Sequence, residues 1–349
     1  MKKILCLLPL CLFACLFAAG CGAVGIGTKG ILRGIYLERQ NGGYQVQLIC
    51  WQGAPSADAA DAEQTALLVE GQGATVREAL QNAQQSRSEE LFYGQNELLL
   101  IGPRLAQEGL YEAVEYLVRQ ETGRPNVTVY LTDLPAGALA AQPETVDGLL
   151  ASVEQVRKRG GYHCYLYQLG DAAQGGLLPN LKVDLKEGAA VPDGLTVYAQ
   201  GRPAHRWDQN QLSMALLLSG QQNTLRFTAG GPEDTVSFTL HSARAVYCPR
   251  QQGGRLRLEV FLQGDIRRVE TRHGAQSPLA DEQYEAFLRT WLAGLARQMT
   301  SETLAEGNDV FLLRSYLDNL NAAAAERQAR QGTLYQQDTV LWVCEARML

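Results

Sequence analysis

The stretch that decides the fold covers residues 66–85, ALLVEGQGATVREALQNAQQ. Its first five residues form an apolar run bounded by Gly71-Gln72-Gly73, as expected of a short strand. Thr75 and Glu78 have the spacing of a capping box, in which side chains bond the free N–H groups of a helix's first turn. An apolar stripe at helical spacing follows at Val76, Leu80 and Ala83. The stretch therefore predicts a strand followed by a helix.

The same alternation continues toward the C-terminus. Residues 96–101 are an apolar strand closed by Gly102-Pro103, and residues 104–121 keep helical spacing before Gly123 and Pro125 end them. The β-branched run NVTVYL at residues 126–131 predicts a third strand. A further helix is expected near residues 136–157. Strands that alternate with helices in this way indicate a sheet with helices packed on it.

On the N-terminal side, the sequence predicts a β-hairpin. The runs ILRGIYL (31–37) and YQVQLICW (44–51) flank the turn sequence Gln40-Asn41-Gly42-Gly43. Asn-Gly between apolar, alternating runs is the strongest short-range hairpin signal.

The C-terminal half has a different pattern. Runs such as 195–200, 212–219 and 235–248 predict an antiparallel meander, and residues 278–330 predict two helices interrupted at Gly307-Asn308. Residues 339–347 predict a closing strand. The fold class is therefore α+β, with two to three mixed domains. The N-terminal half has a mixed sheet with helices, and the C-terminal half has an antiparallel sheet plus two packed helices.

Domain boundaries follow from composition. The Gly- and Pro-containing stretch 170–193 is the best interdomain region, so residues 31–190 are assigned to the N-terminal α+β part and residues 195–349 to the C-terminal domain. Residues 21–30 are rich in glycine and small residues, which predicts a flexible tether.

The first residues have the shape of a lipoprotein signal. Lys2-Lys3 precede the uncharged apolar run Ile4–Ala19, which ends in small residues directly before Cys21. Residues 1–20 are therefore interpreted as a cleaved signal peptide, with Cys21 as the lipidation site. The apolar run is shorter than the ~20 residues a membrane-spanning helix needs. The alternatives are an uncleaved anchor and plain secretion.

Composition excludes several classes of protein. The 349 residues are 46% hydrophobic, which is too apolar for a disordered chain. With 31 basic and 37 acidic residues the net charge is −6, which disfavours nucleic-acid binding. Beyond Cys21, the mature chain has Cys50, Cys164, Cys248 and Cys344, each in an apolar context. Buried thiols and disulfides both remain open for these four.

No catalytic, cofactor or metal site is predicted. The chain has four histidines (His163, His205, His241 and His273), and none is part of a metal-binding motif. Gly71-Gln72-Gly73 lacks the third glycine of a phosphate-binding loop. Tyr162, Tyr165 and Tyr167 are expected to alternate across a strand and pack on a sheet face. Glu89 and Glu90 are expected to be solvated at a helix end.

The order of these motifs resembles the Ger(x)C family, the C-subunit lipoproteins of bacterial spore germinant receptors. The most specific block is residues 70–80, EGQGATVREAL, followed by Leu91-Phe92-Tyr93-Gly94 and Leu98–Gly102. Near the C-terminus, Asn308-Asp309-Val310-Phe311 is similar to the family's D-[IV]-F-G segment. Three features differ from the family pattern. Gly22-Ala23-Val24 follows the lipid cysteine, Leu312 replaces the family's glycine, and Glu345-Ala346-Arg347 replaces its glycine-rich tail.

The resemblance implies a non-enzymatic lipoprotein subunit with three α+β domains. It would be anchored by lipid (palmitate) on Cys21 at the outer face of the inner spore membrane. Its expected partners are the membrane-spanning A and B receptor subunits, and no nucleic acid is expected. The complex would sense nutrients and trigger germination. No other residue acquires a role from the family.

Two other hypotheses remain at this point. A generic extracytoplasmic solute-binding lipoprotein would need two α/β lobes around a cleft. A membrane-tethered hydrolase would need one of the four histidines beside a serine or a carboxylate.

Overall fold

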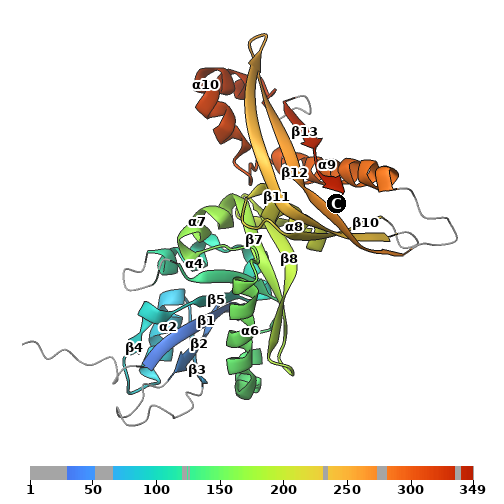
Figure 1. Ribbon diagram of the computed structural model, residues 1–349. Coiled ribbons are helices and arrows are strands. Elements are labelled where there is room, and N and C mark those ends of the chain that lie inside the picture. Colours follow the sequence, from blue (N-terminus) through green and yellow to red (C-terminus); the bar gives the residue numbers. More distant parts are fainter. Residues whose placement is uncertain are drawn as a thin grey trace, which may run out of the picture.

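The chain folds into two α+β bodies, each built on one β-sheet (Figure 1). The computed structural model describes residues 30–51, 66–119, 124, 126–230, 235–272, 281–334 and 339–348. The first sheet has nine strands and ends at Trp207, and the second has five strands and begins at Leu225. The predicted multidomain α+β class is confirmed.

The first body begins with the predicted hairpin. Strands β1 (Gly30–Gln40) and β2 (Gly43–Trp51) pair antiparallel, with Gln40 opposite Gly43. Asn41 and Gly42 have φ values of 51° and 77°, the left-handed conformation that a two-residue type I′ turn requires at both central positions. The Asn-Gly signal is therefore confirmed.

The first sheet has parallel strands at its centre and antiparallel pairs at its flanks. Its order is β3-β2-β1-β5-β6-β7-β8-β9, with β4 beside β1. The pairs β1–β5, β5–β6 and β6–β7 are parallel. The remaining strands are β3 (Ala66–Gly73), β4 (Leu91–Phe92), β5 (Leu98–Ile101), β6 (Thr128–Thr132), β7 (Gly176–Asp184), β8 (Ala189–Ala199) and β9 (Arg202–Trp207).

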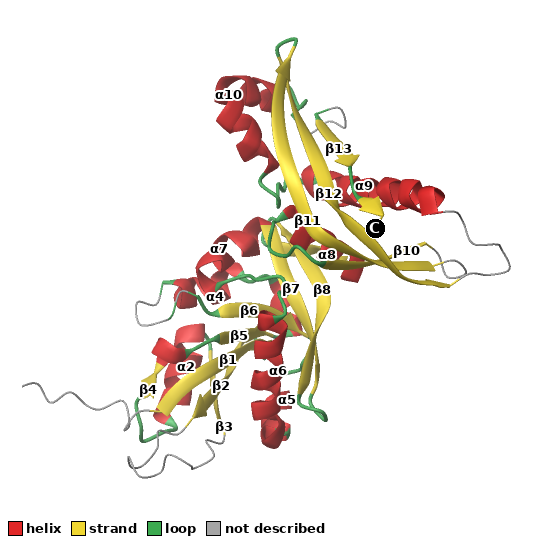
Figure 2. Ribbon diagram, viewed as in Figure 1, coloured by secondary structure: helices red, strands yellow, loops and turns green. Residues whose placement is uncertain are grey.

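Helices cover both faces of this sheet (Figure 2). One face packs against α2 (Val76–Gln85), α3 (Pro103–Glu108), α4 (Tyr111–Val118) and α7 (Leu166–Gly175). The other packs against α5 (Ala138–Ala141) and α6 (Val146–Lys158), which the 3₁₀ turn η3 (Pro143–Thr145) joins. Successive strand residues point to opposite faces, so Leu99 joins the first core and Leu100 the second.

The cap predicted for α2 is present, because the Glu78 N–H donates to Thr75 Oγ1 at 3.2 Å. The single helix expected over residues 104–121 is instead two helices, α3 and α4. They separate at Gly109, whose φ of 111° interrupts the helix. Glu89 and Glu90 lie in the irregular segment that follows α2. The short turn η2 (Tyr93–Gln95) comes after this segment and β4. Glu89 forms an ion pair with Arg87.

The prediction of a strand through the three tyrosines is wrong. Tyr165 precedes α7 and Tyr167 lies within that helix, where it is exposed and stacks on Tyr165 with ring centroids 5.8 Å apart. A bond from Tyr165 N–H to the Gln168 side chain helps begin the helix. Only Tyr165 forms a bridge to the sheet, opposite Thr128.

The second body packs three helices against one face of its sheet, within the described residues. Strands β10, β11 and β12 are antiparallel, whereas β13 and β14 run parallel to β12. The elements are α8 (Gln209–Leu218), β10 (Leu225–Gly230), β11 (Thr235–Gln252), β12 (Arg255–Arg272), α9 (Asp281–Ala305), α10 (Leu313–Arg330), β13 (Val340–Cys344) and β14 (Arg347–Met348). The predicted helix pair and closing strand are thus present.

The strand predicted at residues 212–219 is wrong, because this segment belongs to helix α8. Leu212 and all residues from Met214 to Leu218 are buried, so the helix is apolar on nearly every side and lacks the helical stripe. The missed signal is Asp208 with Gln211, which form a reciprocal capping box.

The predicted division at residues 190–195 is not where the two sheets separate. Strands β8 and β9 pair with β7 and extend the first sheet to Trp207. Leu195, Val197 and Trp207 nevertheless belong to the core of the second body. One continuous cluster therefore joins the last strands of the first sheet to the helices of the second.

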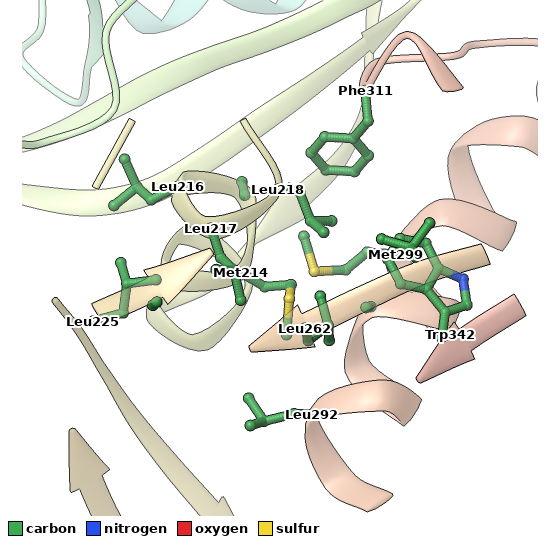
Figure 3. Packing of buried hydrophobic residues seen from close by; sticks show 14 of the residues in the cluster. Met214, Leu216, Leu217, Leu218, Leu225, Leu262, Leu292, Met299, Phe311 and Trp342 are labelled. Carbon is green, nitrogen blue, oxygen red and sulfur yellow. The ribbon is translucent and has the colours of Figure 1, made fainter. Parts of the chain in front are cut away.

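Figure 3 shows part of this second core, where residues of α8, β10, β12, α9 and β13 meet Phe311 of the α9–α10 loop. Met214 and Leu217 of α8, Leu262 of β12, and Leu292 and Met299 of α9 are fully or almost fully buried. Burying each such side chain contributes roughly 1.5–3 kcal/mol. This core stabilises the second body and also attaches it to the first.

Candidate functional site

The predicted lipidation site, Cys21, lies outside the described residues, as do the signal peptide and all of the tether except Gly30. Gly30 is the first described residue and begins β1. No helix in the described part of the chain is long and apolar enough to cross a membrane.

The four mature cysteines other than Cys21 are free thiols. Cys50 and Cys164 are buried, and burial raises the pKa of each thiol to about 12. Since the thiolate is the reactive form, both are poor nucleophiles at neutral pH. Of the two readings left open by the sequence, the structure supports buried, unpaired thiols for Cys50 and Cys164.

The three described histidines lie in different parts of the fold. His163 precedes α7, where burial first and Arg157 second lower its pKa. His205 lies on β9 and contacts the carboxylate of Glu306 at 2.8 Å, whereas His241 lies on β11. His273 lies outside the described residues. Within the described residues, no group of three His, Cys, Asp or Glu side chains could hold a metal ion.

Among the described histidines, His205 contacts a carboxylate, that of Glu306, as the hydrolase hypothesis requires. Each side chain is about one-third exposed, at 34% and 33%. Such a pair on the surface contributes little to stability, typically under about 1 kcal/mol. It lies at a contact between the two bodies, because His205 is on the first sheet and Glu306 follows α9.

The segment 306–312, which includes the motif Asn308-Asp309-Val310-Phe311, forms the joint between the two bodies. The Asn308 side-chain amide donates to the carbonyl of Tyr198 on β8, next to the β-bulge between Val197 and Tyr198. Phe311 stacks on Trp207 of β9, with ring centroids 6.1 Å apart and planes 7° from parallel. This motif therefore fastens the second body to the first sheet.

The same motif begins helix α10. The Asp309 carboxylate accepts from the N–H groups of Leu313 at 2.8 Å and Arg314 at 2.7 Å, which satisfies two donors of the first turn. Burial raises the pKa of Asp309 above its ordinary value, and these hydrogen bonds oppose that change. Leu312 adopts a left-handed conformation, with φ 54° and ψ 35°. That geometry explains why glycine suits this position.

A second line of contact runs beside the joint. The His163 N–H donates to Gln221 Oε1 at 3.0 Å, and Gln222 Nε2 donates to the Arg159 carbonyl at 3.4 Å. Tyr162 packs against the second core. The loop before α7 thus contacts the turn after α8, so the two bodies meet along two separate segments.

The two bodies are unlike each other. The first is a three-layer arrangement with a nine-stranded sheet, and the second covers one face of a five-stranded sheet. This is not the pair of α/β lobes that the solute-binding hypothesis requires. A long β11–β12 hairpin instead extends the second body away from the first (Figure 1).

Comparison with known proteins identifies the class. The crystal structure of the GerBC protein matches with a TM-score of 0.51 at 10% identity, over 91% of this chain and 97% of that chain. Residues 26–153 match the family model described as the spore germination protein N-terminal domain. No curated protein sequence matches.

The fold and the joint therefore define a two-body α+β protein with the fold of a known spore germination protein. Residues 26–153 thus resemble the N-terminal domain of spore germination proteins, and the fold resembles that of GerBC over 91% of the chain. The resemblance drawn from the order of the sequence motifs is confirmed.

Proposed function

We propose that the chain is a non-catalytic lipoprotein subunit of a nutrient germinant receptor, acting in receptor assembly or signalling at the inner spore membrane. The observation that carries this proposal is the family match over residues 26–153, together with a GerBC-like fold that extends over 91% of the chain. Its partners would be the membrane-spanning A and B subunits of the same receptor.

Lipid on Cys21 would hold the protein at the outer face of that membrane. A chain spans at most about 3.5 Å per residue, so the segment from Cys21 to Gly30 reaches roughly 30 Å at full extension. The first body would then lie close to the lipid headgroups. Stable anchoring needs more than one acyl chain, because a single chain gives only reversible binding.

Deleting the gene tests the role in germination. We expect spores of the deletion strain to stay dormant when the nutrient is added, with normal vegetative growth and spore formation. Loss of spore refractility measures the response, and a strain with the gene restored is the control. Normal nutrient germination of the deletion strain would refute the proposal.

Substitution of the anchor residue tests the location. We expect the Cys21→Ala chain to leave the membrane fraction of spore extracts and to fail to restore germination. Cys248→Ala is the matched control, because it removes a half-buried cysteine of the second body. Membrane retention of the Cys21→Ala chain at the wild-type level would contradict anchoring through this residue.

A further inference from the structure

A large cavity lies between helix α6 and the ends of strands β1, β2, β5 and β6 in the first sheet. Its volume is about 720 Å³, within the range of small-molecule sites. The sheet side is formed by Arg33 on β1, Trp51 at the end of β2, and Thr128 at the start of β6. Asp147 and Glu154 line it from α6 and lie seven residues apart, on one face of the helix.

Three of these lining residues carry buried polar atoms without a hydrogen-bond partner among the described residues. The atoms are Nε of Arg33, Nε1 of Trp51 and Oγ1 of Thr128. A fourth, the Tyr130 hydroxyl, lies two residues further along the same face of β6. Buried polar groups are normally paired, so four unpaired groups in one region call for an explanation.

Arg33 reaches this position through a β-bulge. The register of β1 against β2 shifts between Leu32 and Gly34, and Arg33 is the extra residue. Its guanidinium lies over the Trp51 ring, 4.0 Å from the centroid, and donates to Glu97 at 3.0 Å. The stacking and the ion pair hold the guanidinium in place, but its Nε–H group has no hydrogen-bond acceptor within the described chain.

The unpaired groups share one chemical property. All four can donate a hydrogen bond, and the indole and the guanidinium can only donate. The nearby acceptors are already engaged: Glu97 pairs with Arg33 and Arg124, and Glu154 pairs with Arg157 and Lys158. The cavity is lined by two arginines and three carboxylates, but these carboxylates already have partners, so the four donors are left without an acceptor in the part that the structure describes.

We propose that this cavity binds a small organic acid through its carboxylate. The carboxylate oxygens would accept from Arg33 Nε and Trp51 Nε1, with the Thr128 hydroxyl as a third donor. A charged acceptor makes a stronger hydrogen bond than a neutral one, which favours a carboxylate over an amide or an alcohol. Asp147 already accepts from the N–H of Ala66 at 3.2 Å on the β3 side of the cavity, so it does not satisfy these donors.

Titration calorimetry on the full chain in detergent micelles tests the proposal, with sodium acetate, lactate, succinate and citrate as probes and sodium chloride as the control. We expect at least one acid to bind with a Kd below about 1 mM. Thr128→Val has the same shape without the hydroxyl and should weaken that binding about tenfold, the effect of one hydrogen bond. Arg33→Lys keeps the charge but loses Nε–H, so it should weaken binding at least as much.

A stability measurement separates binding from folding. Thr128→Val should raise or leave unchanged the Tm of the ligand-free chain, because it removes a buried unpaired hydroxyl. Thr239→Val, a buried threonine of the second sheet, is the matched control and should leave the Kd unchanged. Trp51→Phe removes Nε1–H while keeping an aromatic ring, and it replaces Arg33→Lys if that variant does not fold.

Two outcomes would overturn the proposal. One is that none of the four acids binds below about 1 mM, which would mean that water alone fills the cavity. The other is an unchanged Kd in folded Thr128→Val and Trp51→Phe, which would place the acid elsewhere on the chain. Both measurements use purified protein, so they stand apart from the germination phenotype.

Discussion

The first sheet is covered on both faces and the second on one, and this difference is visible in their strands. All four residues of β5 are buried, because helices lie above and below it. On β13, Trp342 is buried while its neighbours Leu341 and Val343 are 37% and 39% exposed. Central parallel strands therefore appear in the sequence as unbroken apolar runs, whereas a strand with one free face alternates.

Leucine-to-alanine substitutions would test this comparison most strongly. Leu99→Ala and Leu100→Ala remove side chains from opposite faces of the first sheet, and Leu258→Ala removes one from the inner face of the second. Each should lower the free energy of unfolding by about 3 kcal/mol, because a cavity replaces a fully buried side chain. Leu341→Ala, on the outer face, should cost less than about 1 kcal/mol.

Urea unfolding of the four variants measures these values. A cost for Leu341→Ala equal to that of Leu258→Ala would show that the outer face of the second sheet is covered in solution. The distinction between the two sheets would then be lost.

The joint determines whether the two bodies unfold together. Asn308→Ala removes the amide that bonds the Tyr198 carbonyl, and the loss of a buried hydrogen bond should cost about 2 kcal/mol. We expect the calorimetric transition to broaden or split, because this bond links one body to the other. Asn210→Ala is the control, since its bonds to Thr228 lie within the second body. A single, unshifted transition for Asn308→Ala would contradict a coupling role for this residue.

Leu312 should be replaceable by glycine with a gain in stability. Its left-handed conformation costs roughly 1–2 kcal/mol for a residue with a Cβ, and its side chain is 68% exposed. Allowing for the greater freedom of glycine in the unfolded chain, Leu312→Gly should stabilise the fold by about 0.5 kcal/mol. Ala286→Gly, at an exposed position inside α9, should instead destabilise by about 1 kcal/mol. Thermal unfolding distinguishes the two, and a lower Tm for Leu312→Gly would be the contrary result.

Asp309 should make the joint weakly sensitive to pH. Burial raises its pKa in the folded state above the ordinary value of 3.8, so the folded chain binds the proton more tightly than the unfolded chain. This contribution to stability is fully present below pH 3.8, the ordinary pKa, and is lost as the pH rises through the raised pKa of the folded state. Asp309→Asn lacks the effect, so its stability relative to wild type should increase between about pH 4 and about pH 7. A constant difference in Tm across that range would show that Asp309 does not titrate in this way.

Local signals accounted for much of the fold. Asn41-Gly42 predicted the first hairpin and Thr75 predicted the start of α2, because each depends on residues within a few positions of one another. The spacing of apolar residues gave a wrong prediction at α8. This helix is buried on nearly all sides, so its apolar residues show no helical periodicity. The prediction was also wrong at Tyr165 and Tyr167, where helix α7 begins.

Long-range packing decided what the local pattern could not. The assignment of β8 and β9 to the first sheet depends on pairing with β7, since their composition alone suits either body. The cavity was missed for the same reason. Arg33, Trp51 and Thr128 are ordinary residues of three strands, and only the bulge and the sheet order bring them together beneath α6.

The sequence by itself determined the α+β class, the hairpin, most helix positions, the resemblance to spore germination proteins, and the expectation of a lipid anchor at Cys21. These depend on residues close together in the chain or on the order of short motifs. Only the tertiary structure decided how the two bodies meet, why glycine would suit the position of Leu312, and which donors around the cavity lack partners. Each of those depends on contacts between residues far apart in the chain, which the pairing of strands and the packing of helices create.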